Sequence, residues 1–161
     1  MSFRIRRAEA SDTTALADFI INLHTFHRLE GQSREQVQAW VDQHLDLCFA
    51  DSSHSIYVAD GAGAQLLGYV SVHWLPCLFL PGPEGYVSEL FIAEAARGEG
   101  TGTALLQVVK EEARERGCTR LSLLNIRDRE SYQRGFYAKD GWEERPDAAN
   151  FIFDMGDSPQ G

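Results

Sequence analysis

Several features that define other protein classes are missing from this sequence of 161 residues. Its three cysteines, Cys48, Cys77 and Cys118, are odd in number, widely spaced and outside any CxxC pair, so the sequence suggests neither a disulfide framework nor a zinc site. The five histidines show no metal-ligand spacing, and we expect no bound metal. No run approaches the ~20 apolar residues of a membrane-spanning helix, and the basic start lacks the apolar region of a signal peptide. We therefore expect no membrane association and a cytoplasmic location.

Positive charge is also scarce in this chain. Lysine and arginine number 15 against 24 acidic residues, which gives a formal net charge of −9. Surfaces that bind nucleic acid are basic, so this balance argues against a nucleic-acid partner. It is compatible with a cationic substrate, although many proteins are acidic for solubility alone.

The remaining composition is that of a globular domain, with 43% hydrophobic and 24% charged residues. We expect one domain over residues 1–155, followed by a flexible tail at 156–161. The hydrophobic periodicity and the capping residues predict alternating strands and helices in an α/β or α+β fold, with a mixed sheet covered by helices on both faces. The predicted strands are 3–7, 55–60, 65–74, 86–92, 121–126, 142–145 and 150–155, and the predicted helices are 11–23, 33–49, 102–117 and 130–140.

A glycine-rich turn joins the strand ending at Ile92 to the helix after it. Gly98, Gly100 and Gly102 lack Cβ atoms, so the backbone can approach a ligand closely, and the N–H groups at a helix start converge on an anion. Arg97 adds a charge-assisted donor. The spacing matches neither a P-loop nor the dinucleotide fingerprint, which disfavours ATP and NAD. A flexible helix entry explains an isolated GxGxG equally well.

The turn and several other segments together resemble the GNAT superfamily of N-acetyltransferases. Its acetyl-CoA signature is Arg or Gln, two residues, Gly, any residue, then Gly or Ala, and the sequence from Arg97 to Gly102 matches it in full. Further similarities are Arg6-Arg7-Ala8 followed by Asp12, the strand Glu89-Leu90-Phe91-Ile92, and Phe136-Tyr137 ahead of Gly141-Trp142. The resemblance implies a single-domain fold with about seven strands and about four helices, in which splayed central strands hold acetyl-CoA.

The resemblance also implies which residues contact acetyl-CoA. In the family, one central strand binds the pantetheine arm through its backbone, the next strand splays away, and the turn binds the pyrophosphate. Many members carry Asn seven residues before the helix tyrosine, where this chain has Glu130. The implied cofactor contacts are Leu90, Phe91, Ile92, Arg97, Gly98, Glu99, Gly100, Thr101, Gly102, Thr103 and Asn125.

Acetyl transfer to an amine requires a neutral nitrogen, a stabilised oxyanion and a proton for the leaving thiolate. Glu89 is the candidate base, and strand alternation predicts that it shares a face with Val87 and Phe91. A carboxylate paired with arginine or placed at a sheet edge is the alternative. Tyr137 matches the family's general acid, and the fit of the Phe-Tyr pair and of its distance to Gly141-Trp142 favours this role over the alternative of a core aromatic with a locally bonded hydroxyl. A backbone N–H between Leu90 and Ile92 is the expected oxyanion donor.

The acceptor is the least determined part of this interpretation. In the family the first two helices and their junction form a wall of the acceptor pocket, which here includes Phe26, His27, Arg28 and Glu30, unless these are solvated helix ends. The apolar loop from Trp74 to Pro83 could line the site, cover it or pack in a dimer. We expect a small-molecule primary amine as acceptor. A protein or peptide amine, another acyl-CoA donor and a non-catalytic acyl-CoA sensor remain alternatives, as does a homodimer paired through residues 150–155.

Overall fold

The structure, a computed structural model, describes residues 2–156 of the chain. These residues form two compact units, the first ending at Leu124 and the second beginning at Asn125. The predicted flexible tail lies outside the described residues, apart from Gly156. Within residues 2–156, no helix has the length and apolar character needed to cross a bilayer.

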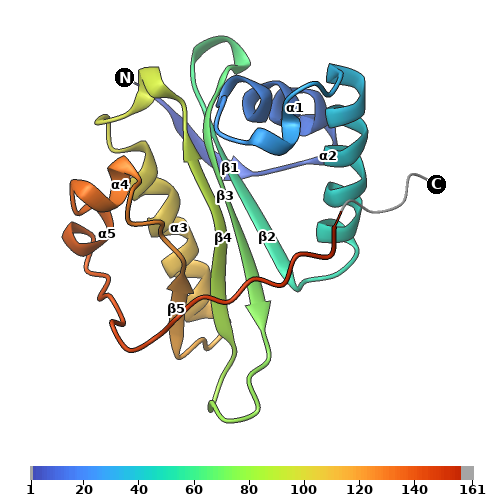
Figure 1. The fold of residues 1–161 in the computed structure, drawn as a ribbon. Coiled ribbons are helices and arrows are strands. Elements are labelled where there is room, and N and C mark those ends of the chain that lie inside the picture. Colours follow the sequence, from blue (N-terminus) through green and yellow to red (C-terminus); the bar gives the residue numbers. More distant parts are fainter. Residues whose placement is uncertain (1, 157–161) are drawn as a thin grey trace. The chain divides into compact units, whose positions relative to one another are not determined.

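The first unit contains a five-stranded mixed sheet in the order β1-β2-β3-β4-β5 (Figure 1). The first four strands pair antiparallel, and β5 runs parallel to β4. Because each strand follows its neighbour in the chain, only the link between β4 and β5 needs a crossover, and α3 supplies it. The strands are β1 (Arg4–Arg7), β2 (His54–Asp60), β3 (Leu66–Leu75), β4 (Glu84–Ile92) and β5 (Arg120–Leu123).

Helices cover both faces of this sheet, as the sequence predicted (Figure 1). Helices α1 (Thr13–Asn22) and α2 (Arg34–Phe49) pack on the face that carries Ile56 and Val58. Helix α3 (Thr101–Glu115) packs on the opposite face, where it contacts β2, β3 and β4. The alternation of β2 and β3 therefore buries side chains on both sides of the sheet, and the predicted α+β class is confirmed.

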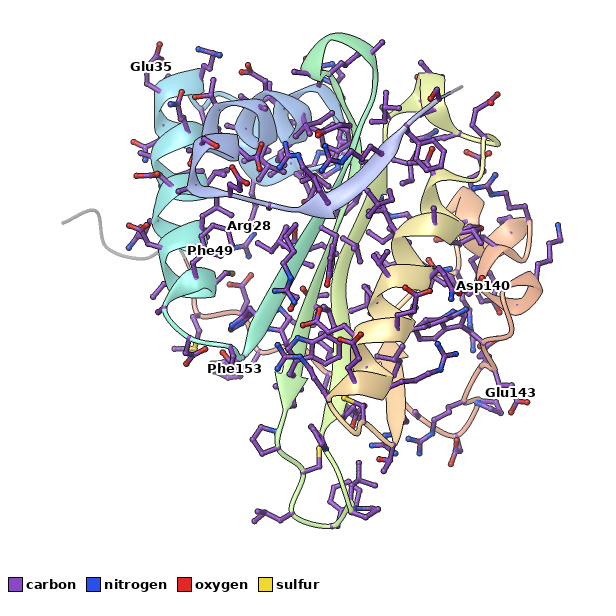
Figure 2. All side chains as sticks on the ribbon, turned by 180° about the vertical axis from the view of Figure 1, so that it is seen from behind. Arg28, Glu35, Phe49, Asp140, Glu143 and Phe153 are labelled. Carbon is purple, nitrogen blue, oxygen red and sulfur yellow. The ribbon has the colours of Figure 1, made fainter. Side chains whose placement is uncertain are left out.

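Local sequence signals set the ends of the long helices. Ser33 caps α2 through its side-chain oxygen, which accepts a hydrogen bond from the backbone N–H of Gln36 at 3.1 Å. Figure 2 labels Glu35 in the first turn of this helix and Phe49 at its last residue. Gly117, with φ of +70°, follows the end of α3, as the sequence predicted.

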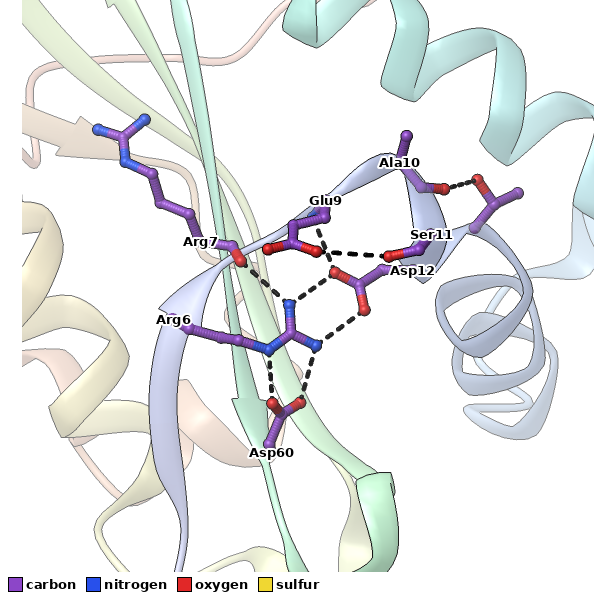
Figure 3. Close-up of polar contacts among 8 residues, drawn as sticks. Arg6, Arg7, Glu9, Ala10, Ser11, Asp12 and Asp60 are labelled. Carbon is purple, nitrogen blue, oxygen red and sulfur yellow. Dashed lines mark hydrogen bonds and ion pairs between the residues drawn. The ribbon is translucent and has the colours of Figure 1, made fainter.

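Arg6 joins the first strand to two other elements (Figure 3). Its guanidinium donates to both carboxylate oxygens of Asp12, each at 2.8 Å, and also to the carboxylate of Asp60 at the end of β2. The side-chain hydrogen bonds to Asp12 and Asp60 raise the pKa of Arg6. The backbone N–H of Glu9 donates to Asp12 as well, so this carboxylate also orders the short 3-10 turn Ala10–Asp12 that begins α1.

A buried carboxylate ties α3 to β2. Glu112 is 5% exposed and accepts hydrogen bonds from Ser55, Tyr57, Arg7 and Arg116 at 2.7 to 2.9 Å. Burial by itself would raise the pKa of Glu112, but the hydrogen bonds from Tyr57, Ser55 and Arg116 outweigh it and lower the pKa. The four donors thus compensate a buried charge.

We expect Glu112→Ala to lower the free energy of unfolding by about 3 kcal/mol, because it leaves buried donors unpaired. Denaturant unfolding measures this effect, with Glu111→Ala on the exposed side of α3 as the control. The pKa of Glu112 is lowered from 4.5 in the folded state, so its contribution is present above about pH 4.5 and is lost as the pH falls through the folded pKa. Equal stability of the two variants would contradict the prediction.

The second unit differs from the sequence prediction in two ways. The single helix predicted over 130–140 is divided into α4 (Glu130–Gln133) and α5 (Phe136–Lys139), because Gly135 adopts a left-handed φ of +66° between them. The strands predicted at 142–145 and 150–155 are not formed within the described residues, so the sheet has five strands and not seven.

The reason for the missing strands lies in their surroundings. Trp142 donates its backbone N–H to Tyr137, which ties the first segment to α5, and Pro146 supplies no N–H for a ladder. The side chains of Phe151, Ile152 and Phe153 are at least 85% exposed. Their β-propensity therefore has no neighbouring strand to act on. The predicted pairing of two copies through this segment remains a prediction, without the preformed strand that it assumed.

Candidate functional site

Within the first unit, one edge of β4 has no strand partner over its second half. Strand β5 pairs with residues Glu84 to Val87 of β4, and the last paired residue of β5 is Leu123. From Ser88 to Ile92, the only strand of this unit that pairs with β4 is therefore β3. Alternate backbone groups of a strand point to opposite sides, so some N–H and C=O groups of Leu90, Phe91 and Ile92 face away from β3. These groups are suited to an extended ligand arm, as the resemblance implied for these three residues.

The glycine-rich turn follows directly from this edge. A 3-10 turn at Glu94–Ala96 leads to Arg97, and α3 begins at Thr101. Gly98 and Gly100 have φ of +80° and +84°, the left-handed region that favours glycine. No heavy atom of the described residues lies within 4 Å of where a Cβ would sit on either glycine. The turn is thus open to a ligand on the side where side chains would otherwise project.

The first turn of α3 suits an anion. Its initial N–H groups have no partner within the helix, no side chain caps them and no acidic residue occupies the first turn. The hydroxyl of Thr101 is buried without a hydrogen-bond partner among the described residues. The residues from Arg97 to Thr103, including Glu99, Gly102 and Thr103, therefore surround a helix N-terminus with open space before it, which fits the pyrophosphate of a CoA ligand.

Glu89 shares its face of the sheet with Phe91, as the sequence predicted, but not with Val87. A register shift in the β3·β4 ladder opposes Ser71 to Glu89 and Val72 to Val87, which leaves Ser88 as an extra residue. The bulge moves Val87 to the α3 face, while Glu89 and Phe91 remain on the face of α1 and α2. The prediction of one shared face was wrong for Val87, because simple alternation does not account for an inserted residue.

The Glu89 carboxylate is exposed, and a buried tyrosine holds it. Tyr69 donates its hydroxyl to Oε2 of Glu89 at 2.6 Å. Within the first unit, no arginine pairs with this carboxylate. On the same face, His73 shares a hydrogen bond of 2.8 Å with Ser88, and its ring centroid lies 4.3 Å from that of His54. Burial and the neighbouring His54 lower the pKa of His73, which favours the neutral form of this imidazole.

The four residues predicted to form an acceptor wall separate into two kinds. Phe26 packs edge to face on Phe91 with ring centroids 5.1 Å apart, which places it on the face of Glu89. His27 and Glu30 are highly exposed and pair with each other at 2.8 Å, and Arg28 belongs to the same 3-10 turn, His27–Leu29. Phe26 therefore contacts the predicted catalytic strand, while the His27–Glu30 pair has the geometry of a solvated turn.

Asn125 and Tyr137 belong to the second unit. Strand β5 ends before Asn125, and the side-chain oxygen of Asn125 accepts from the Ser131 hydroxyl at 3.1 Å. Tyr137 packs edge to face on Phe136 and Trp142, with centroids 4.9 and 6.1 Å away. Within residues 125–156, its hydroxyl has no hydrogen-bond partner. Burial raises the pKa of Tyr137, so the hydroxyl keeps its proton at neutral pH.

A cavity of about 490 Å³ lies elsewhere on the first unit. Its lining includes Trp74, Cys77 and Leu80 of the predicted apolar loop, together with Asp51 and Arg116. Arg116 follows the C-terminus of α3, whereas the glycine turn precedes its N-terminus, and the helix between them is roughly 22 Å long. The loop therefore lines a cavity remote from the proposed pyrophosphate site.

Sequence reasoning missed two features of this site. The sequence pattern places Tyr69 inside the predicted strand 65–74 without a role at the site, and it does not predict the bulge at Ser88. The sequence holds no local signal for either, because both depend on the cross-strand register of β3 and β4. Residues 2–156 contain no cluster of three or more His, Cys, Asp or Glu side chains able to hold a metal ion.

Comparison with known proteins gives one family and many similar folds. Residues 18–142 match the model of the acetyltransferase (GNAT) family. The acetyltransferase Atu2258 of Agrobacterium fabrum is 42% identical over 53 residues, which are 33% of this chain and 31% of the relative. The matched segment thus spans about a third of that curated relative.

Solved structures agree in fold along nearly the full chain. An integron cassette protein from the mobile metagenome of V. cholerae has a TM-score of 0.82 at 18% identity, covering 97% of this chain and 94% of its own. Glucosamine-6-phosphate N-acetyltransferase from Arabidopsis thaliana gives 0.75 at 18%, and ribosomal-protein-alanine N-acetyltransferase from Brucella melitensis biovar Abortus 2308 gives 0.74 at 19%. Both of these matches cover 96% of this chain and 100% of the other. At such identities the likeness concerns the fold alone.

Proposed function

Since this chain belongs to the acetyltransferase (GNAT) family, we propose that it transfers the acetyl group of acetyl-CoA directly to a primary amine of a small molecule. One observation carries the proposal. The unpaired edge of β4 from Ser88 to Ile92 leads directly into a turn with two left-handed glycines at the N-terminus of a 15-residue helix. The edge of β4, proposed to bind the pantetheine arm, is thus followed in the chain by the N-terminus of α3, proposed to bind the pyrophosphate.

Acetyl-CoA supplies the acetyl group as a thioester, and the residues of the chain bind it and move protons. The backbone N–H groups from Gly98 to Thr103, with Arg97, bind the pyrophosphate. The open edge from Leu90 to Ile92 binds the arm and donates one N–H to the carbonyl oxygen as negative charge develops there. A role for Asn125 beside the arm is part of the same proposal.

Glu89 is the proposed base. An ammonium with a pKa of about 10.4 is neutral in only about one molecule in a few thousand at pH 7, so a group that removes its proton speeds the reaction. Glu89 is exposed, lies on the open half of β4 and shares its face with Phe91 and Phe26. This position supports contact with an amine directly or through one water molecule.

Tyr137 is the proposed acid for the departing thiolate. Its hydroxyl keeps its proton at neutral pH because burial raises its pKa, and no partner within its own unit competes for that proton. Tyrosine in this state can donate to a thiolate as the carbon–sulfur bond breaks.

We propose the acceptor as a chemical class, a primary amine, and name no single compound. The names of the two acetyltransferase structures indicate a sugar amine for one protein and a protein alanine for the other, so the fold accommodates different amines. The net charge of −9 and the exposed Glu89 favour a small cationic amine here. A protein amine, or acyl-CoA binding without catalysis, is the alternative.

We expect amine-dependent thiol release from acetyl-CoA across a panel of polyamines, amino acids, amino sugars and peptides. Glu89→Gln should lower kcat/KM for the best amine about 100-fold at pH 7 and leave calorimetric acetyl-CoA binding unchanged, since glutamine keeps an oxygen that accepts from Tyr69 but removes no proton. Propionyl-CoA and succinyl-CoA, run alongside, define the donor. Binding without turnover on any amine would support the sensor alternative, and absence of binding would refute the proposal.

A further inference from the structure

A buried tyrosine and an exposed carboxylate are joined across β3 and β4. The hydroxyl of Tyr69 donates to Oε2 of Glu89 at 2.6 Å, although the direct cross-strand partner of Glu89 is Ser71. Tyr69 thus reaches diagonally over the sheet to the residue that follows the bulge at Ser88. The distance is that of a charge-assisted O–H···O⁻ bond, which is among the stronger hydrogen bonds in proteins.

The donor in this pair has little freedom to move. Tyr69 is 4% exposed, and its ring packs on Phe19 and Phe91 with centroids 5.7 and 5.8 Å away. Phe91 in turn packs on Phe26. Two aromatic neighbours, one of them packed on Phe26, therefore determine where the Tyr69 hydroxyl lies. Glu89 by itself has several rotatable bonds and an exposed side chain.

The geometry points to Tyr69 as a positioning residue for the proposed reaction: its hydroxyl holds Oε2 of Glu89 and leaves Oε1 for the acceptor amine. Within the first unit, Oε1 accepts no other hydrogen bond. The inference rests on the proposed role of Glu89 as base. It explains why a catalytic carboxylate can stand exposed on a strand and still keep one orientation, because the orientation comes from a buried donor.

The other titratable groups near the Glu89 carboxylate are His73 and His54 on the neighbouring strands and Cys48 on α2. Burial and the charge of Glu89 raise the pKa of Cys48, which is therefore a neutral thiol at pH 7. All three groups are unchanged in the variants below, so their effects cancel in the comparison.

The test is the separate measurement of kcat and KM for wild type and Tyr69→Phe, by thiol release with acetyl-CoA and the best amine of the panel. Phenylalanine keeps the ring packing and removes only the hydroxyl. We expect kcat at pH 7 to fall about tenfold, because the carboxylate of Glu89 loses the donor that fixes its orientation. The KM for acetyl-CoA should stay within about twofold, because the pyrophosphate turn is untouched.

Two further variants make the result specific. Tyr86→Phe is the matched control, because Tyr86 is a half-buried tyrosine of β4 whose hydroxyl is not the donor to Glu89, and its kcat should equal that of wild type. Adding Tyr69→Phe to Glu89→Gln should lower kcat no further, since the carboxylate is already gone.

The possible failures are distinguishable. A kcat that is unchanged in Tyr69→Phe, but strongly lowered in Glu89→Gln, would overturn the positioning role and leave the base role intact. Full activity of Glu89→Gln would overturn the base role and the inference together, while acetyl transfer itself would stand. A fall in kcat that is equal in Tyr69→Phe and Tyr86→Phe would indicate a loss of packing and would also overturn the inference.

Discussion

Replacing Tyr137 with phenylalanine should lower amine-dependent turnover of acetyl-CoA about 100-fold or more, with acetyl-CoA affinity changed less than about twofold. The substitution removes the proposed proton donor for the thiolate and nothing else. The edge-to-face contacts of the ring with Phe136 and Trp142 do not involve the hydroxyl, and this hydroxyl has no hydrogen-bond partner within residues 125–156. We therefore expect an unchanged fold and a defect in kcat, with binding retained.

Tyr132→Phe provides the control for this prediction. Tyr132 belongs to α4 in the same unit, but its exposed hydroxyl donates to Glu144 at 2.8 Å. Its removal should change turnover less than about twofold, since exposed hydrogen bonds contribute little. Steady-state kinetics measures the turnover of both variants, and calorimetry measures their affinity for acetyl-CoA. If Tyr137→Phe kept wild-type turnover, Tyr137 would be a packing residue and another group would protonate the thiolate.

Gly100→Ala should weaken acetyl-CoA binding about 100-fold. Two effects combine at this position. A φ of +84° costs a non-glycine residue roughly 1–2 kcal/mol, and the new methyl group would project into the open space before α3, where the pyrophosphate is proposed to lie. The backbone N–H groups could then no longer approach the phosphate oxygens to hydrogen-bonding distance.

Gly117→Ala separates the two effects. Gly117 has φ of +70° and equally open surroundings, but it lies after the C-terminus of α3. Both variants should lose about 1 kcal/mol of stability by denaturant unfolding, whereas only Gly100→Ala should lose acetyl-CoA affinity by calorimetry. Equal affinities in the two variants would show that the turn at Gly100 does not bind the cofactor.

Local sequence patterns predicted most elements of the first unit correctly. The helix capped by Ser33, the helix that ends at Gly117 and the glycine turn depend on interactions between residues close in the chain, which a sequence displays directly. The final segment failed for the opposite reason. Its apolar residues Phe151, Ile152 and Phe153 have strand propensity, but a strand requires a neighbour, and nothing within residues 150–155 specifies one.

The sequence by itself indicated the family, and it located the turn proposed to bind the pyrophosphate and the two residues proposed as base and acid, Glu89 and Tyr137. These inferences follow from a motif with short spacing and from side chains that few other residues can replace. Only the tertiary structure decided which face Glu89 occupies and which donor holds it. Both depend on the bulge at Ser88 and on a hydrogen bond between residues 20 positions apart. Such contacts arise from strand register, and the packing of distant segments sets that register.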